Sequence, residues 1–381
     1  MLRFGILTTA LPAKDSKKSR NGNYVPNKTW RLFHIAGYQR QMKVLFFRAE
    51  DIDFQKRRVH AWTSTSKDGL SGWTRNYHPL PDVIYENYYL NLVGSDPRIL
   101  KVRREFIRRG IPVFNPTLFN KAALHRILSA SDSTRGYIPP SSPVRKASDV
   151  LAFLKTFQPI YLKPVTGSGG AGILQVELLG SGQIRVRSER FTNNQRFTKY
   201  FTSGQFQHFM ARQLSKRRYL AQKGLKLIHK GDQKIDFRVV VHRDSTGMWK
   251  SVGIRPKLGK TGSIITNSHA GGQKTTWSRL FRWSQQERVH LPDRSALEKA
   301  SIAVAERLTA FRPHLSHLGI DVAACEDGRI YVLDVNPRPG RDLLTPEMLV
   351  LVTQYTVGFA SYLTKQQRRS SSHDFITPFQ Y

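Results

Sequence analysis

Short apolar runs alternate with amphipathic segments along the first 116 residues of the chain. Short runs of aliphatic and aromatic side chains are typical of strands, whereas apolar positions spaced by three and four are typical of helices. The pattern predicts a strand, a helix, two strands, a helix and a strand, at residues 4–8, 29–41, 42–47, 79–87, 101–109 and 111–114. Strands that alternate with helices indicate a parallel sheet with crossover helices. We therefore expect an α/β domain over residues 1–116.

Two stretches of this domain have little periodicity. Residues 14–27 are rich in Lys, Ser, Asn and Gly and predict a loop, and residues 62–78 are rich in turn-forming residues. At the N-terminus, Arg3 precedes a mostly apolar run, a pattern that signal peptides share. We interpret residues 4–8 as the first strand of the sheet, and a signal peptide is the alternative.

Beyond residue 116 the pattern favours helices and antiparallel strands. Helices are predicted at residues 120–128 and 147–157, and strands at residues 159–165, 173–179, 184–186, 219–225, 236–241, 249–254, 320–324 and 330–335. Turn sequences join the last four strands into two hairpins. Residues 366–381 follow no pattern and predict a disordered tail.

The last hairpin carries three oxygen-bearing side chains. Alternation places Asp334 and Asn336 on one face and Leu333 and Val335 on the other, and Asp321 lies on the partner strand. Two carboxylates and an amide oxygen suit Mg²⁺ that holds nucleotide phosphates. Carboxylates crowded together also repel one another unless a cation lies between them. The alternative is an ordinary hairpin with a polar face.

A lysine precedes a glycine-rich loop in the middle of the chain. Lys163 lies in a predicted strand, and the loop that follows contains Gly167, Gly169, Gly170 and Gly172. The dinucleotide-binding fingerprint requires a helix directly afterwards, but residues 173–179 alternate like a strand. A Walker A loop is also excluded, because its lysine follows the glycines. We interpret the loop as a flap whose N–H groups close on phosphates beside Lys163, and a plain glycine hairpin is the alternative.

Other positions give weaker signals. A strand leaves through a hinge at Gln222, Lys223 and Leu225, and backbone groups of such a hinge can hydrogen-bond adenine. Asp236 and Arg238 share one strand face, opposite the apolar side chains of the same strand. The next strand delivers Arg255, and a polar loop contains Asn267, able to meet a phosphate or an acyl group.

Composition adds an electrostatic constraint. The chain has 61 Lys and Arg residues against 27 Asp and Glu residues, a formal net charge of +34, without a polybasic run. Such a surface attracts nucleic acid, anionic polymers, acidic proteins or anionic membranes. The single cysteine, Cys325, excludes an intrachain disulfide, fits a reducing compartment and is more typical of a core than of a nucleophile. No apolar run approaches the roughly 18 residues that span a bilayer, so we expect a cytoplasmic protein without a transmembrane segment.

Taken in order, these features resemble the ATP-grasp superfamily. The ordered set is Lys121, Lys163 with the glycine flap, the hinge, Arg238, Asn267 with Gly271 and Gly272, and Asp334 with Asn336. Within the superfamily the chain is most similar to the YheC/YheD-type endospore coat-associated proteins, in residues 79–85, 120–121 and 333–340. The loop at residues 267–272 is also similar to that of the ribosomal-protein glutamate ligases. One departure is Asp334, because many ATP-grasp enzymes have glutamate there, and the shorter side chain could weaken bidentate metal binding.

The resemblance implies a fold and a division of the chain. The fold is α/β (α+β), an ATP-grasp fold with an N-terminal α/β pre-ATP-grasp domain at residues 1–116 and an ATP-grasp domain at residues 117–365. The first subdomain, residues 117–225, carries the glycine flap. The second subdomain, residues 226–365, carries the metal site.

The resemblance also implies a chemistry. ATP-grasp enzymes use ATP to convert a carboxylate into an acylphosphate, from which an amine or a thiol displaces phosphate. It implies ATP and Mg²⁺, or Mn²⁺, as cofactors, with the metal on Asp321, Asp334 and Asn336. Lys121 and Lys163 would then bind the α- and β-phosphates. Arg255 and Asn267 would face the γ-phosphate and the acylphosphate.

Three functions compete at this point. The first is an ATP-dependent carboxylate–amine ligase of a sporulating bacterium, cytoplasmic or in the spore coat, with unknown carboxylate and amine substrates. The second is a non-catalytic, nucleotide-binding component of the spore coat. The third is a nucleic-acid- or polyanion-binding protein, suggested by the charge alone. The basic surface predicts an acidic coat protein or an anionic polymer as a partner.

Overall fold

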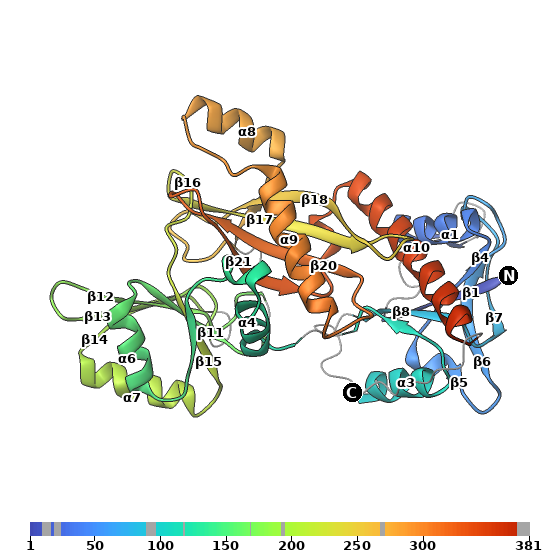
Figure 1. The fold of residues 1–381 in the computed structure, drawn as a ribbon, viewed down its shortest axis with the longest axis horizontal. Helices are drawn as coiled ribbons and strands as arrows, with labels where there is room; N and C mark the ends of the chain where they lie inside the picture. Colours follow the sequence, from blue (N-terminus) through green and yellow to red (C-terminus); the bar gives the residue numbers. More distant parts are fainter. Residues whose placement is uncertain are drawn as a thin grey trace.

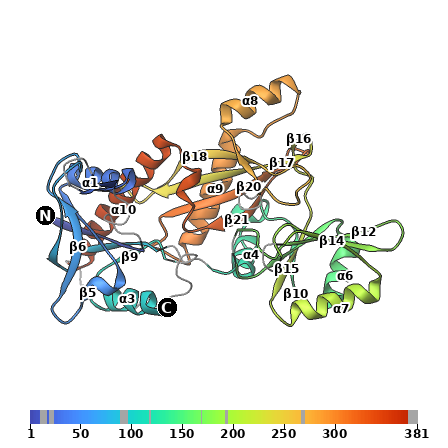
Figure 2. The same cartoon turned by 180° about the vertical axis from the view of Figure 1, so that it is seen from behind.

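A computed structural model describes residues 1–9, 17–18, 24–88, 97–116, 119–167, 169–191, 195–266 and 271–371. Three large sheets follow one another along the long axis of the molecule (Figure 1). The N-terminal sheet lies at one end, the sheet of β17 to β21 lies in the middle, and the sheet of β10 to β15 lies at the far end. The view from behind shows the same order (Figure 2). The sheet that comes last along the sequence therefore lies at the centre of the molecule.

The N-terminal sheet has β1 (Leu2–Thr8) at its centre, so the strand predicted at residues 4–8 is confirmed. The sheet order is β5 (Ile52–Asp53), β6 (Arg58–Ser64), β4 (Met42–Phe47), β1, β8 (Val83–Asn87) and β9 (Val113–Phe114). As predicted, β1 pairs in parallel with its neighbours, β4 and β8.

The stretch at residues 62–78, which is rich in turn-forming residues, contains a strand as well as turns. β7 (Trp73–Pro79) pairs with β6 as an antiparallel hairpin over this stretch. Alternate side chains of β6 are buried, which is the periodicity of a half-buried strand. Of the loop predicted at residues 14–27, the structure describes only residues 17–18 and 24–27, which include the short strands β2 (Lys17–Lys18) and β3 (Tyr24–Val25).

The last helix of the chain joins two parts of the molecule. The N-terminal sheet is covered by α1 (Lys28–Gln39), whose first turn is capped by Asn27, by α3 (Pro97–Arg108) and by α10 (Pro346–Ser371). Phe359 of α10 packs with Phe114 in the N-terminal core, whereas Met348 packs against Val240 of the central sheet. Residues far apart in sequence therefore complete one core.

The tail expected from residue 366 does not begin there, because α10 continues to Ser371. Its packing against the N-terminal domain extends into this last part, where the Gln367 side chain donates to the carbonyl oxygen of Gly110. Residues 372–381 lie outside the described residues.

The sheet at the far end is antiparallel and six-stranded. Its order is β10 (Ser141–Val144), β15 (Tyr219–Lys223), β11 (Ile160–Pro164), β12 (Leu174–Leu178), β13 (Ile184–Ser188) and β14 (Phe197–Phe201). Two helices, α6 (Ala147–Thr156) and α7 (Ser203–Leu214), pack on it. The glycine loop leads from β11 into β12 and not into a helix, which confirms the exclusion of a dinucleotide-binding fingerprint.

The central sheet has one apolar face and one largely polar face. Its order is β19 (Gln273–Lys274), β18 (Trp249–Leu258), β17 (Gln233–Arg243), β20 (His317–Ala324) and β21 (Ile330–Asn336), and β16 (His229–Lys230) pairs with β17. Phe237, Val239 and Val241 pack with α4 (Lys121–Ser129) and α9 (Arg294–Thr309). The opposite face carries Asp236 and Arg238, as the alternation predicted, and α8 (Trp277–Gln286) projects from the body (Figure 1).

Two further expectations can be compared with the fold. Cys325 is 6% exposed, and burial raises the pKa of its thiol to about 11, which is the behaviour of a core cysteine. Within the described part of the chain, no helix combines the length and the hydropathy that a membrane span needs.

Candidate active site

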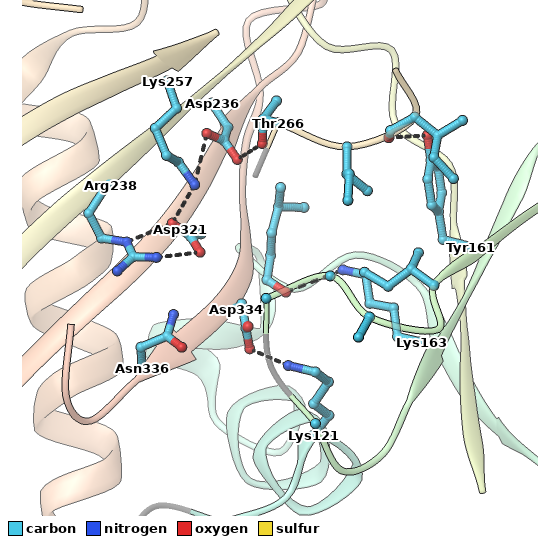
Figure 3. Close-up of a pocket in the computed structure, with 18 of the residues that line it drawn as sticks. Lys121, Tyr161, Lys163, Asp236, Arg238, Lys257, Thr266, Asp321, Asp334 and Asn336 are labelled. Atoms are coloured by element: carbon cyan, nitrogen blue, oxygen red, sulfur yellow. Dashed lines mark hydrogen bonds and ion pairs between the residues drawn. The ribbon is translucent and has the colours of Figure 1, made fainter. Parts of the chain in front are cut away.

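A cavity of about 360 Å³ lies between the central sheet and the sheet at the far end. The central sheet supplies charged side chains, and β11 and the glycine loop face them (Figure 3). The cavity is lined by twelve residues that the sequence or the resemblance suggested for nucleotide or metal binding: Lys121, Lys163, Gly167, Gly169, Gly170, Gln222, Lys223, Leu225, Arg238, Asp321, Asp334 and Asn336. Segments more than 200 residues apart in sequence therefore meet at one site.

Four charged residues form a buried cluster on the central sheet. Arg238 donates from Nε and Nη2 to Oδ1 and Oδ2 of Asp321, at 2.7 and 2.9 Å. Lys257 Nζ lies 2.8 Å from Oδ1 of Asp321 and 3.1 Å from Oδ1 of Asp236 (Figure 3). Thr266 donates from Oγ1 to the other oxygen of Asp236. The strand register explains the cluster, because Arg238 lies directly opposite Asp321, and Asp236 opposite Lys257.

Burial and pairing shift the pKa values in this cluster. Burial raises the pKa of Asp236, and Lys257 offsets part of that rise. Burial also acts to raise the pKa of Asp321, but Arg238 and Lys257 outweigh it and hold the pKa well below its ordinary value. Burial acts to lower the pKa of Lys257, but the two carboxylates outweigh it and the net shift is upward. Asp321 therefore stays ionised at neutral pH, and Lys257 stays protonated.

Asp334 and Asn336 lie beside this cluster on β21. Asp321 and Asp334 are register partners, as the hairpin prediction required. Oδ1 of Asp334 accepts from Lys121 Nζ at 2.8 Å, which leaves Oδ2 without a hydrogen-bond partner among the described residues. The side-chain oxygen of Asn336 likewise has no such partner in the described part of the chain. These two oxygens are therefore available as ligands of a cation.

A bulge corrects the predicted alternation of β21. The pairing shifts between Asp321 and Val322, so that Leu333 has no register partner on β20. Val332 and Val335 are the core members, and Leu333 lines the cavity beside Asp334, although strict alternation predicted the opposite face for it. Bulges re-aim side chains in this way next to active sites.

Lys163 on β11 reaches across the cavity to the hairpin. Its Nζ donates to Oε1 of Gln222 at 2.5 Å and to the carbonyl oxygen of Leu333 at 3.3 Å. Burial lowers the pKa of Lys163 to about 8, and Asp334 opposes part of the shift. The nearby carboxylates offset only part of the cost of burying this ammonium group. An anionic ligand beside Lys163 would therefore be stabilised.

The glycine loop needs its glycines. Gly169 and Gly170 have φ angles of 67° and 77°, and Gly172 has 73°, in the left-handed region that other L-residues avoid. Arg190 holds the loop from the β13 side, because its Nη1 donates to the carbonyl oxygen of Gly169 at 2.6 Å and its own carbonyl oxygen accepts from the N–H of Gly172. The loop therefore presents its backbone to the cavity from a fixed base.

Among the described residues, the hinge has fewer backbone groups available to a ligand than the sequence suggested. The N–H groups of Lys223 and Gly224 already donate to the carbonyl oxygens of Pro140 and Pro159. Of these hinge residues, Leu225 keeps an N–H group without a backbone partner among the described residues. Gln222 contributes its side chain rather than its backbone, through the bond to Lys163.

One expected residue is not among those that line the cavity, and others line it that were not expected. Arg255 lies opposite Arg238 on β18 but is not among the cavity-lining residues, and Asn267 lies outside the described residues. Lys257, two positions after Arg255 on the same strand face, lines the cavity, and the alternation of β18 could have identified it. Tyr161 and Arg338 also line the cavity without having been predicted, and neither carries a sequence signal of its own.

Comparisons with known proteins identify the family of the chain. The YheC/D-like ATP-grasp family matches residues 110–363. The chain is 25% identical over 318 residues to the endospore coat-associated protein YheD of Bacillus subtilis (strain 168), which covers 80% of this chain and 69% of YheD. It is 24% identical over 311 residues to YheC of the same organism, which covers 78% of this chain and 81% of YheC.

Solved structures include the ATP-grasp ligase PsnB in complex with a phosphomimetic variant of its minimal precursor, Mg and ADP. That comparison has a TM-score of 0.48 and 12% identity, and it covers 97% of this chain and 98% of PsnB. The fold and the family expected from the sequence are confirmed by the family match, which spans more than half of the chain. The chain belongs to the YheC/D-like ATP-grasp family.

Proposed function

We propose that the protein binds Mg-ATP in this cavity and acts as an ATP-dependent carboxylate–amine ligase through an acylphosphate. Membership of an ATP-grasp family supports an ATP-dependent ligase in general. One observation supports the finer assignment: two lysines, a backbone flap and free oxygen donors line a single cavity. Phosphoryl transfer needs positioning and charge stabilisation more than covalent help from the protein, and this set supplies both.

The nucleotide would lie across the cavity with its base at the hinge. Tyr161, Ile173, Leu225 and Leu227 give this part of the cavity apolar surface, and the free N–H of Leu225 can donate to a ring nitrogen of adenine. The phosphates would then point toward Lys163 and Lys121. The flap would close over them, because backbone N–H groups in a glycine loop form an anion-binding concavity.

Arg238 and Lys257 would stabilise the charge that develops at the γ-phosphate. Both are held by Asp321, so their positions are fixed before the nucleotide arrives. Preorganised cations of this kind lower the barrier without a cost of reorganisation in the transition state. Arg255 and Asn267 remain proposed contacts of the γ-phosphate and of the acylphosphate.

The oxygen donors fit a divalent cation in part. Within the described part of the chain, Asp334 and Asn336 each have an oxygen free for Mg²⁺ or Mn²⁺, whereas both oxygens of Asp321 are already occupied by Arg238 and Lys257. When bound, the cation would neutralise phosphate charge in transfer. Asp321, the third ligand that the resemblance implies, would have to share its oxygens with Arg238 and Lys257. Among the described residues, no cluster of three His, Cys, Asp or Glu side chains offers another metal site.

The two alternative functions are a non-catalytic, nucleotide-binding component of the spore coat and a nucleic-acid- or polyanion-binding protein. The names of YheC and YheD place those relatives at the endospore coat, and a coat component that binds nucleotide without turnover would need the lysines and the flap alone. We place the protein in the cytoplasm or the spore coat of a sporulating bacterium. The net charge of +34 supports an acidic coat protein or an anionic polymer as a further partner.

Nucleotide binding is tested by thermal unfolding with and without Mg-ATP. A ligand of the folded state raises the melting temperature, and Lys163→Ala should remove most of this rise. Lys155→Ala, on the exposed side of α6, is the matched control and should retain the full rise. Equal shifts in Lys163→Ala and wild type would reject the site.

Catalysis is tested by release of ADP and phosphate with a panel of amino acids, peptides and polyglutamates as acceptors. Acceptor-dependent release supports the ligase. If Mg-ATP binds and no acceptor in the panel stimulates release, the non-catalytic coat component replaces the ligase as the better account.

A further inference from the structure

The carboxyl end of β8 carries a buried glutamate that two arginines share. Arg103 of α3 donates from Nε and Nη2 to the two oxygens of Glu86, at 2.6 and 2.7 Å. Arg338, in the segment that follows β21, donates from Nη2 to Oε1 of the same carboxylate. The Glu86 side chain is 1% exposed, and that of Arg338 is 8% exposed. The N-terminal domain therefore reaches directly into the segment that lines the cavity.

A second contact fixes the same segment. Asn115 has a φ angle of 61°, in the left-handed region that asparagine tolerates better than most residues. Its Nδ2 donates to the carbonyl oxygen of Pro337 at 2.7 Å, and its own carbonyl oxygen accepts from Arg338 Nη2 at 3.4 Å. Its Oδ1 accepts from the N–H groups of Ser316 and His317 at the start of β20. Asn115 therefore contacts Arg338, the residue before it and the start of β20 at once.

The charges in this cluster do not cancel. Among the described residues, one carboxylate faces two guanidinium groups, so one positive charge remains in a largely buried place. Arg103 uses Nε and Nη2 for its two hydrogen bonds to the Glu86 carboxylate. Arg338 donates from Nε and Nη2 to Glu86 and Asn115, and its Nη1 has no partner among the described residues. Arg338 also lines the cavity, two positions after Asn336. A partly anchored arginine with excess charge is suited to an oxyanion.

We propose that Arg338 binds the carboxylate group of the ligase substrate, and that Glu86 and Asn115 are the positioning residues that aim it. The proposal rests on the proposed function and extends it, because it gives the N-terminal domain a role in substrate binding. The phosphates have other cations in Lys121, Lys163 and Lys257. Arg338 differs from these three in being anchored by the N-terminal domain.

The test measures two affinities of the whole 381-residue chain by titration calorimetry. The first is for Mg-AMPPNP, a non-hydrolysable ATP analogue. The second, measured with and without the analogue, is for acetate, glutarate, L-glutamate and triglutamate at constant ionic strength. At least one carboxylate should bind wild type. Arg338→Gln should weaken that binding at least about tenfold, the scale of losing one charge-assisted hydrogen bond, and should change the analogue's affinity less than about twofold.

Controls separate the role of Arg338 from folding and from general charge. Arg338→Gln leaves Glu86 paired with Arg103, so the fold is retained. Arg108→Gln removes an exposed arginine that pairs with Glu105 on α3, and it should change neither affinity. Glu86→Gln should weaken carboxylate binding while analogue binding is retained, and Glu86→Asp should restore part of it. A purely structural Glu86 would instead lower both affinities together.

The outcomes distinguish this proposal from the proposed function. If wild type binds no Mg-AMPPNP, the nucleotide site fails, and the carboxylate titration without the analogue still tests Arg338. If wild type binds none of the four carboxylates, the role of Arg338 is rejected. The same holds if Arg338→Gln binds carboxylate as wild type does, or loses nucleotide affinity to the same extent as carboxylate affinity.

Discussion

Lys257 on β18 and Asp321 on β20 form an ion pair across the intervening strand, with 2.8 Å between Nζ and Oδ1. Arg238 occupies both oxygens of the same carboxylate. The sequence suggested that carboxylates crowded on this face would repel one another unless a metal ion lay between them. The structure overturns that argument, because lysine and arginine side chains of the chain itself neutralise the acidic groups.

Asp321→Asn should therefore destabilise the ligand-free protein strongly. Removing one carboxylate of a buried charge cluster leaves Arg238 without its paired carboxylate and Lys257 with Asp236 alone, which costs about 3–5 kcal/mol. The free energy of unfolding in urea measures the loss. Asp334→Asn is the control, because Asp334 and its partner Lys121 are 31% and 21% exposed, and their pair should contribute no more than about 1 kcal/mol. Equal losses in the two variants would contradict the buried cluster.

Asp334→Asn should instead reduce turnover. It removes a charged oxygen donor on which the proposed cation depends, and the loss of one strong electrostatic stabiliser costs about a hundredfold. Nucleotide binding should remain, with reduced affinity, because the lysines and the flap are unchanged. Steady-state release of ADP with an active acceptor measures the effect. Turnover of Asp334→Asn at the wild-type rate would show that Asp334 is not a metal ligand.

The stability of the ligand-free protein should depend on pH through Lys163. Burial lowers its pKa in the folded protein from an ordinary value of 10.5 to about 8. Between these two values the unfolded chain binds more protons, so the free energy of unfolding gains a contribution that rises with pH across this window. Urea unfolding at a series of pH values measures it. In Lys163→Met this contribution should be absent, and a difference curve between the two proteins that is flat would disprove the shift.

The same group should couple ATP binding to proton uptake. Phosphates favour the charged lysine, so binding near pH 8.5 should draw a proton onto Lys163 from the buffer. Calorimetry in two buffers of different ionisation enthalpy gives the number of protons taken up. Affinity should fall as the pH rises above about 8. Proton uptake that persists in Lys163→Met would assign it to another residue.

Gly170→Ala should weaken ATP binding by more than its effect on stability. Gly170 has a φ angle of 77° in the flap, and Gly182 has 79° in the turn between β12 and β13, with open space around it. Alanine at either position meets the same left-handed strain, about 1–2 kcal/mol. Both variants should lose similar stability, but only Gly170→Ala should lose ATP affinity, about tenfold or more. A parallel loss of affinity in Gly182→Ala would mean that strain alone explains the effect.

Binding to polyanions should be strong at low salt and weak at high salt. The basic residues that follow α7 illustrate the surface, since Lys216 and Arg218 are exposed. Fluorescence titration with poly-L-glutamate and with duplex DNA should show affinity that falls steeply between 50 and 200 mM salt, the range over which counterion release acts. The variant Lys216→Glu with Arg218→Glu should bind both polymers less tightly. Affinity that is independent of salt, or a sequence preference in DNA alone, would contradict a general polyanion surface.

Local pattern was sufficient for many elements of the fold, but it did not predict β7 or the helices α7 to α10. The strand at residues 42–47 and the hairpin that pairs Asp321 with Asp334 follow from alternation and turn signals, since both depend on neighbours along the chain. The alternation also predicted the shared face of Asp236 and Arg238. It failed at Leu333, because a bulge depends on the partner strand and leaves no mark in a single strand's sequence.

The sequence by itself therefore determined many of the elements, the family and twelve of the residues that line the cavity. Only the tertiary structure decided how those residues are paired. In the folded protein Asp321 pairs with Arg238 and Lys257, Glu86 pairs with Arg338, which is 252 positions away, and α10 is part of the N-terminal core. The physical reason is that strand periodicity fixes which way a side chain points, whereas the charge that it meets is set by sheet order and domain packing between segments far apart in the chain.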